Sequence, residues 1–396
     1  MERYLTSVAQ RKLRTLQLGF VTPYDALNVR SWSGTPYHMA PALTVAGCTL
    51  EYLCPLERGR LGEATLTAKK AFYRLLNRKY LADWHRPGLR RYAEEISRRL
   101  VGKRPDFLLS TVSYPFAYLD TEIPFAYWCD ATFASLIGYY RTYTGLCDES
   151  VRTGLALEKE IFSRARLAIY SSEWAAESAL ATYGGDRSRV RVVPFGANVE
   201  CNRTAEDIRT LVAARSDRLC RLLFVGVDWV RKGGDTALAV AAHLHGMGVP
   251  VELTLVGSGP PAEAPLPSWV RSLGFISKAS AEGRRRLEAL FAESHFLLLP
   301  SQAECTAIVF SEAASFGLPC LATATGGTPT IVRDGRNGRT FAPDVPPARW
   351  AEHIAALFAA PERYGELART AFEEYRTRLN WTVAAATVER HIREAL

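Results

Sequence analysis

The chain has 396 residues, of which 48% are hydrophobic and 23% charged, values typical of a globular protein with room for two domains. No apolar run reaches the ~18–20 residues of a membrane-spanning helix, and the N-terminal segment lacks the apolar core of a signal peptide. Eight scattered cysteines form no C-x-x-C pair, which argues against a zinc site or a disulfide framework and predicts reduced, mostly buried thiols in a cytoplasmic protein.

The first half of the chain is predicted to alternate short strands with helices. Residues 1–13 are expected to be a loose leader before a first strand at Leu16–Val21. A Ser-Gly-Thr loop then opens a helix within Trp32–Ala46, and His38 in this helix is interpreted as a packed histidine. Further strands are expected at Phe107–Ser110, Ile123–Trp128, Leu167–Ser171 and Arg189–Pro194.

The formal net charge of +8 is concentrated in residues 58–104, which carry fourteen Lys and Arg residues against four Asp and Glu residues. Apolar residues such as Phe72 and Leu75 alternate there with cations such as Arg74 and Arg78, a pattern typical of a basic amphipathic helix. Such a helix packs its apolar face on its own domain, docks on anionic lipid or an acidic glycan, or binds nucleic acid. No nucleic-acid-binding motif accompanies the charge, so nucleic acid is not expected as a partner.

The second half repeats the alternation after residues 200–220, which are polar and irregular and are interpreted as a linker. A helix is expected at about 234–246, and an amphipathic helix at Trp381–Leu396. Strands are expected at Arg221–Gly226, Val251–Val256, Phe296–Pro300 and Pro319–Ala324. The whole pattern predicts an α/β protein with two Rossmann-like, doubly wound domains facing a central cleft, where ligands bind at the carboxyl ends of the strands.

The most informative stretch runs from Pro300 to Gly338, PSQAECTAIVFSEAASFGLPCLATATGGTPTIVRDGRNG. It places Glu304 and Glu312 eight positions apart, and a helix is expected at Ser311–Phe316. If one helix holds both glutamates, they lie about two turns apart on one face and can grip a polyhydroxylated ligand at two points. The alternative is that Glu304 is a helix N-terminal charge and Glu312 is solvated.

The order PS, Glu304, Glu312, G-x-P, GG and V-x-D-G-x-N-G resembles the retaining glycosyltransferases of family 4, which have the GT-B fold. The resemblance covers roughly residues 15–390 and is densest over 221–340. It implies transfer of a sugar, with retention of configuration, from a nucleotide-diphosphate donor to a hydroxyl acceptor. It also implies an acceptor-binding domain over 1–200, a nucleotide-sugar-binding domain over 201–378 and a helix over 379–396 that crosses back.

By resemblance, Glu304 holds hydroxyls of the donor sugar and Glu312 holds those of the ribose. Gly226 ends a strand before Arg231 and Lys232, which are expected to neutralise the diphosphate; Val227 stands where the family usually has an arginine. The resemblance places backbone groups around the donor at Phe275 and Ile276 for the base, and at Thr306, Ala307 and Ile308 for the sugar and diphosphate. No Asp-x-Asp follows a strand, so neither a metal nor a cofactor other than the donor is expected.

In the first half, Gly34 lies where the family has a glycine-rich loop near the donor phosphates, although a plain helix-capping loop fits as well. Asp130 ends an apolar strand and is expected to orient or deprotonate the acceptor hydroxyl. The alternative for Asp130 is the N-cap of the following helix.

Several alternatives stay open at this point. The chain is either the transferase, or a hydrolase or synthase of the same fold that acts on nucleotide sugars, or a non-catalytic protein that binds nucleotide sugars or membranes. The base and the sugar are not readable, and a glycan, a lipid and a small molecule all fit as the acceptor. The expected location is the cytoplasm, and docking of residues 58–104 on the anionic inner face of the membrane stays open beside the alternative that this segment packs on its own domain.

Overall fold

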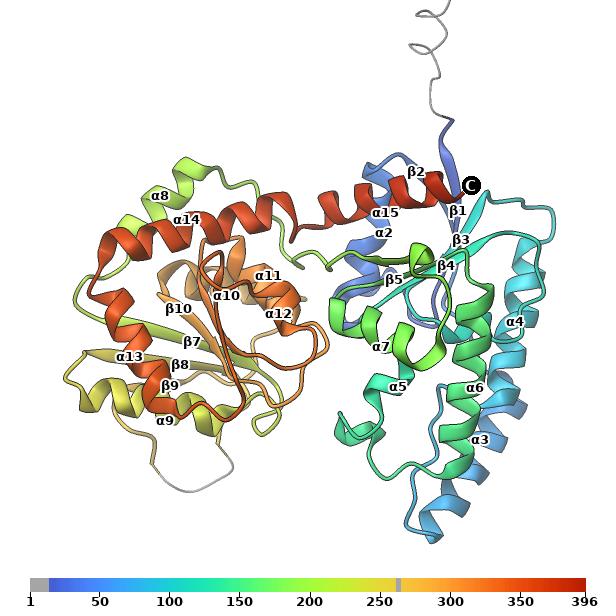
Figure 1. Ribbon diagram of the computed structural model, residues 1–396, viewed down its shortest axis with the longest axis horizontal. Coiled ribbons are helices and arrows are strands. Elements are labelled where there is room, and N and C mark those ends of the chain that lie inside the picture. The colour runs from blue at the N-terminus through green and yellow to red at the C-terminus, as the bar shows by residue number, and fades with distance from the viewer. Residues whose placement is uncertain (1–13, 261–264) are drawn as a thin grey trace, which may run out of the picture.

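The computed structural model describes residues 14–260 and 265–396, so the leader expected over residues 1–13 lies outside the described part of the chain. Within the described residues, the strands form two six-stranded parallel sheets, one in each half of the chain. Figure 1 shows the two sheets, each flanked by helices, as two bodies side by side. The predicted α/β architecture of two doubly wound domains is therefore confirmed.

The N-terminal sheet has strands β1 (Leu16–Val21), β2 (Cys48–Leu53), β3 (Phe107–Ser110), β4 (Phe125–Cys129), β5 (Leu167–Tyr170) and β6 (Val190–Val192). They pair in the order β2-β1-β3-β4-β5-β6. The bounds of β1 and β3 agree with the prediction, and the other predicted strands are shortened or shifted by one or two residues. The edge strand β2 was not predicted, because its residues are partly exposed and form no continuous apolar run.

Helices cover both faces of this sheet. One face packs against α2 (Thr35–Val45) and the crossing helix α15 (Trp381–Ala395). The opposite face packs against α4 (Arg86–Leu100), α6 (Asp148–Arg164) and α7 (Glu173–Tyr183). In Figure 1 the red helix α15 lies beside the blue helix α2, although they come from opposite ends of the sequence.

The basic segment forms two helices rather than the single helix expected. The first is α3 (Gly59–Leu75), and the second is α4, which begins with proline in its first turn. Helix α4 buries Leu89, Tyr92 and Ile96 in the domain core, as an ordinary surface helix does. Helix α3 buries only Gly62 and Leu66, so most of its surface remains open to solvent.

The C-terminal sheet has strands β7 (Cys220–Gly226), β8 (Val251–Gly257), β9 (Val270–Ser272), β10 (Phe296–Leu299), β11 (Cys320–Thr323) and β12 (Gly338–Phe341). They pair in the order β12-β11-β10-β7-β8-β9. The prediction missed β9 and β12, which are the two edge strands. The helices of this domain are α9 (Gly234–Gly246), α10 (Ala281–Glu293), α11 (Ile308–Ala314), α12 (Thr328–Ile331), α13 (Pro347–Phe358) and α14 (Pro361–Thr377).

The expected irregular linker over 200–220 is wrong in its middle, where α8 (Ala205–Ala213) forms. Thr204 and Asp207 make a capping box, in which each side chain accepts a hydrogen bond from the other residue's backbone N–H. Ile208 is 2% exposed and packs beneath Gly317. A local cap and one buried apolar residue therefore stabilise a helix in a segment whose composition indicated a loop.

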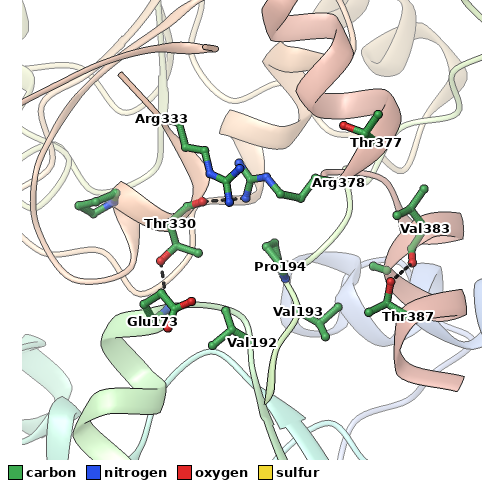
Figure 2. A pocket seen from close by; sticks show the side chains of 12 residues that line it. Glu173, Val192, Val193, Pro194, Thr330, Arg333, Thr377, Arg378, Val383 and Thr387 are labelled. Carbon is green, nitrogen blue, oxygen red and sulfur yellow. Dashed lines mark hydrogen bonds between the residues drawn. The ribbon is translucent and has the colours of Figure 1, made fainter. Parts of the chain in front are cut away.

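Two chain crossings run side by side between the domains. The backbone N–H of Ala197 in the first crossing donates to the carbonyl of Leu379 in the second, at 3.0 Å. A cavity of about 410 Å³ lies beside this crossing. Figure 2 shows its lining, with Glu173 on one side and Arg333 and Arg378 on the other. The Arg378 guanidinium donates to the carbonyl of Thr330 at 2.7 Å, so it holds the second crossing against the C-terminal domain.

All eight cysteines lie in the described residues and are free thiols, six of them buried, as the sequence predicts. No helix of the described residues is both long and apolar enough to cross a membrane.

Candidate functional site

A cavity of about 890 Å³ opens between the domains at the carboxyl ends of β7 and β8 and the start of α11. Its walls contain ten of the predicted site residues: Gly226, Arg231, Lys232, Phe275, Ile276, Glu304, Thr306, Ala307, Ile308 and Glu312. The N-terminal domain contributes Val29, Arg30 and Ser33. Gly34 and Asp130 do not line this cavity, although Gly34 directly follows Ser33.

The first predicted glutamate, Glu304, lies in the loop after β10 and is 5% exposed. Its Oε2 pairs with the Nζ of Lys232 and, at 3.2 Å, with the Nη1 of Arg231. Arg231 also donates to the carbonyl of Ala303 and pairs with Asp228 at 3.4 Å. The two cations expected at the diphosphate therefore share one carboxylate, and an entering anion would compete for them.

Glycines allow the Lys232 turn to approach the ends of two strands. A Cβ at Gly226 would lie 2.8 Å from the Cγ of Lys232, and a Cβ at Gly233 would collide with the carbonyl of Pro300. Gly233 also has φ +74°, a backbone conformation that disfavours other residues. These close approaches explain why the Lys-Gly-Gly sequence follows β7 and brings the ammonium group to Glu304.

The second predicted glutamate, Glu312, lies on α11 with 0% exposure, so the alternative of a solvated Glu312 is wrong. Its Oε1 pairs with the Nζ of Lys278, whereas its Oε2 is buried and has no hydrogen-bond partner within the described residues. A buried acceptor without a partner costs about 1–3 kcal/mol, a cost that a ligand hydroxyl in the cavity would remove. This unsatisfied oxygen indicates a site for a hydroxylated ligand.

The two glutamates do not share one helix, so the condition under which they would lie two turns apart on one face is not met. Helix α11 begins at Ile308, earlier than expected, and Glu304 precedes it in the loop. At this helix start, the backbone N–H groups of Thr306, Ala307 and Ile308 donate to no protein acceptor within the described part of the chain. Free N–H groups at the start of a helix are suited to bind an anion.

On the N-terminal side, Trp32, Ser33 and Gly34 form a left-handed turn, with φ values of 43°, 56° and 83°. Such a conformation is strained at the two residues that are not glycine. The carbonyl of Ser33 accepts from Asn198 Nδ2 at 2.7 Å, and Asn198 accepts from the indole N–H of Trp381 at 2.8 Å. Gly34 occupies the N-cap position of α2, which agrees with the alternative prediction of a helix-capping loop.

Asp130 follows β4 and is half-buried. Burial raises its pKa to about 6, and the negative charge of Glu304 adds to this effect. It is not the N-cap of the next helix, because Thr132 caps α5 (Phe133–Leu136) through a capping box with Ser135.

His38 has its pKa lowered to about 4 by burial and by the positive charge of Lys278, so its imidazole is neutral near pH 7.

Sequence reasoning missed four residues at this site. Lys278 and Arg30 line the cavity, and Lys278 lies two residues after the predicted base loop, a position that could have drawn attention to it. Tyr139 and Tyr140 reach the Glu304 loop from the N-terminal domain. No local pattern marks these tyrosines, because their role depends on a contact between domains. Among the described residues, no group of three or more His, Cys, Asp or Glu side chains is arranged to hold a metal ion.

Comparisons with known proteins agree with this geometry. Residues 220–360 match the family described as Glycosyl transferases group 1. The D-inositol 3-phosphate glycosyltransferase of Xylanimonas cellulosilytica is 28% identical over 246 residues, which cover 58% of this chain and 57% of that protein. Its counterpart in Mycobacterium avium is 30% identical over 210 residues, 52% of this chain and 49% of that protein. The chain thus spans about half the length of the curated relatives that it matches.

Solved structures resemble the whole chain. Sucrose-phosphate synthase from Thermosynechococcus elongatus has a TM-score of 0.68 at 18% identity and covers 96% of this chain and 99% of that chain. Anabaena HepE in complex with UDP-glucose has a TM-score of 0.60 at 14% identity and covers 96% of this chain and 100% of that chain. WaaG, a glycosyltransferase involved in lipopolysaccharide biosynthesis, has a TM-score of 0.58 at 16% identity and covers 94% of this chain and 99% of that chain. These likenesses confirm the GT-B fold.

Proposed function

We propose that the protein is a retaining glycosyltransferase that moves a sugar from a nucleotide-diphosphate donor to a hydroxyl acceptor without a metal. The observation that carries the proposal is the fully buried Glu312, whose Oε2 has no partner in the described residues. The same cavity holds Lys232 and Arg231 on Glu304. One cavity thus offers an acceptor for hydroxyl groups and two cations for a diphosphate.

The reaction needs charge stabilisation on the leaving diphosphate. Lys232 and Arg231 would move from Glu304 to the phosphate oxygens, helped by the N–H groups of Thr306 and Ala307. Glu304, released from both cations, would then accept hydrogen bonds from hydroxyls of the donor sugar. These groups supply the stabilisation that a metal ion supplies in other transferases.

The acceptor would approach from the N-terminal domain. Asp130, with its pKa near 6, is mostly ionised at pH 7 and is suited to take the proton of the acceptor hydroxyl. Attack from the face that the diphosphate leaves would retain the anomeric configuration. The acceptor is a hydroxyl group of a glycan, a lipid or a small molecule. UDP-glucose is the first donor to test, because HepE, which shares the fold, binds it.

A second proposal concerns location, namely that the cytoplasmic protein docks on an anionic membrane through α3. Five apolar residues spaced three or four positions apart form one exposed stripe on this helix, the α3 stripe: Leu61, Ala64, Ala68, Phe72 and Leu75. Leu61 is 76% exposed and Leu75 is 87% exposed. Cations of the same segment, among them Arg74 and Arg78, are also exposed. This combination is typical of helices that lie in the surface of anionic bilayers.

Donor binding is the first test. Thermal shift and calorimetry with UDP, GDP, ADP, TDP and their sugar conjugates, without added metal, should give one preferred base. At one hundred times its Kd, a ligand stabilises the folded protein by about 2.7 kcal/mol. Glu312→Gln should weaken nucleotide binding at least tenfold, because the ribose loses a charged acceptor, whereas Glu366→Gln on the exposed side of α14 should not.

Turnover then separates the alternatives. Glu304→Gln should abolish sugar transfer and keep most of the nucleotide affinity. A non-catalytic binding protein would instead show no sugar transfer even before the substitution. Rapid release of sugar from the donor alone would instead identify a hydrolase. If the parent protein binds none of the nucleotides, the glycosyltransferase proposal is wrong.

A further inference from the structure

Two neighbouring tyrosines of the N-terminal domain reach into the C-terminal domain. They lie in the loop between α5 and α6, and their hydroxyls contact the loop that carries Glu304. The backbone N–H of Glu304 donates to the Tyr139 hydroxyl at 2.8 Å, and the backbone N–H of Cys305 donates to the Tyr140 hydroxyl at 2.9 Å. The Tyr139 hydroxyl also lies 2.9 Å from the Oγ1 of Thr325. Two successive backbone groups of the C-terminal domain therefore bind side chains of the other domain.

Tyr140 has a second contact with the same cluster. The guanidinium carbon of Arg231 lies 5.2 Å from the centroid of the Tyr140 ring, within the range of a cation–π interaction. Arg231 is the cation that pairs with Glu304 at 3.2 Å. The tyrosine therefore contacts both the backbone beside Glu304 and the side chain that holds its carboxylate.

The opposite side of the Glu304 loop is closed by two glycines. A Cβ at Gly326, which has φ +50°, would collide with the carbonyl of Glu304 and lie too close to the Tyr139 hydroxyl. A Cβ at Gly327 would collide with the carbonyl of Cys305. The loop is thus enclosed between the tyrosines and the glycine pair, and it has little freedom to move while the domains are in contact.

Two further hydrogen bonds join the domains near this loop. The hydroxyls of Ser171 and Thr306 lie 2.5 Å apart, and the backbone N–H of Glu173 donates to Thr330 Oγ1 at 3.0 Å, the contact drawn in Figure 2. If the domains separate, the N–H groups of Glu304 and Cys305 must bind water instead of the tyrosines. The geometry of Glu304 is therefore coupled to the contact between domains.

We propose that Tyr139 and Tyr140 are positioning residues that latch the two domains together and hold Glu304 and Arg231 in place for turnover. The proposal rests on the glycosyltransferase function proposed above. Tyr139 and Tyr140 are not among the residues that line the donor cavity, so they act through Glu304 and Arg231, which do line it. Closure of the domains then completes the donor site, and a donor bound to the C-terminal domain alone would remain unreactive.

The test uses the full chain with Tyr139→Phe, Tyr140→Phe, the double variant and Tyr140→Leu. Tyr118→Phe is the matched control, because its ring lies against Arg90 and its hydroxyl has no hydrogen bond in the described residues. Each Tyr→Phe change should lower kcat about tenfold or more and leave the Kd for the nucleoside diphosphate within about twofold. Tyr140→Phe removes one interdomain hydrogen bond and Tyr139→Phe removes at least two, whereas the donor-binding groups remain. Tyr140→Leu should lose more than Tyr140→Phe, because it also removes the ring beneath Arg231.

A second readout does not depend on turnover. Small-angle scattering of the full chain should give a larger radius of gyration for the double variant than for the parent. The proposal that Tyr139 and Tyr140 join the domains is wrong if the double variant has the parent's radius of gyration and kcat. It is also wrong if kcat falls only in proportion to nucleotide affinity. If the parent protein binds no nucleotide, the proposed function fails, and the scattering comparison still decides whether the tyrosines join the domains.

Discussion

Asp130 shows how a single residue can link the proposed chemistry to stability. Burial raises its pKa from 3.8 to about 6, so the folded protein binds its proton more tightly than the unfolded chain does. Between these values the folded state loses stability as pH rises, because an unfavourable buried charge forms. Above about pH 6 the ionised Asp130 lowers the free energy of unfolding by its full amount, and below about pH 4 this destabilisation is absent.

We therefore expect Asp130→Asn to raise the free energy of unfolding at pH 8 by about 1–2 kcal/mol, since each pKa unit corresponds to about 1.4 kcal/mol and the residue is partly exposed. The gain should disappear at pH 3.5. The same variant should lower kcat by about 10²–10⁴, and kcat of the parent should rise with pH through about 6. Urea unfolding at several pH values and a pH–rate profile measure both effects, with the exposed Asp120→Asn as control. A stability gain that is equal at pH 3.5 and pH 8 would contradict this account.

Residues with a motif were found from sequence, and residues without one were not. Glu304, Glu312, Lys232 and Arg231 lie in one cavity, as expected. The shared face for the two glutamates, which required one continuous helix, does not form because Glu304 precedes α11, and a local spacing does not reveal where a helix starts. Lys278 was missed, because the pairing of a lysine with a distant buried glutamate depends on the tertiary structure.

At the scale of elements, interior strands were predicted better than edge strands. Strands buried on both faces give continuous apolar runs, as in β3 and β10, and these runs are visible in sequence. Strands β2, β9 and β12 lie at sheet edges and keep exposed residues, so they were missed. The GT-B architecture was nevertheless predictable, because the alternation of strands and helices survives the loss of edge strands.

Helix α3 gives a prediction at this scale. We expect the protein to bind phosphatidylcholine vesicles only when phosphatidylglycerol is included, and to bind less at high salt, since anionic lipid attracts each nearby cation by about 1 kcal/mol. Reversing the charge of Lys70, Arg74 and Arg78 should reduce binding more than 100-fold. Replacing Leu61, Phe72 and Leu75 by Ser should reduce it as well.

Vesicle pelleting measures the bound fraction. The matched control reverses the charge of Arg349, Arg369 and Arg376, which are also exposed and lie in the C-terminal domain. If this control lowers binding as much as the α3 variants do, net charge alone drives the attraction. Binding that survives both α3 changes would show that α3 is not the docking surface.

At the scale of the whole molecule, α15 ties the two domains together. Its buried residues Trp381, Ala385, Val388 and Ile392 belong to the core of the N-terminal domain, although the helix follows α14 of the C-terminal domain. We expect Val388→Asp to destabilise the N-terminal domain by about 3–5 kcal/mol, because it buries an unpaired charge at a position with 0% exposure. The C-terminal domain should stay folded.

Differential scanning calorimetry should therefore show two separate transitions for Val388→Asp, with the upper one still raised by nucleotide. Arg390→Ala on the exposed side of the same helix should unfold like the parent. A single transition at the lower temperature for Val388→Asp would mean that neither domain is stable without the other.

The position of α15 also determines when each domain can mature during protein synthesis. Domains commonly fold in the order in which the ribosome releases them. Here the N-terminal domain is made first, yet the sheet face beside α2 lacks its cover until residues 381–395 have emerged. The C-terminal domain, whose core needs no residue from α15, can be complete by then. The nascent chain therefore carries an exposed apolar surface through most of its translation, and this surface is where a chaperone would bind.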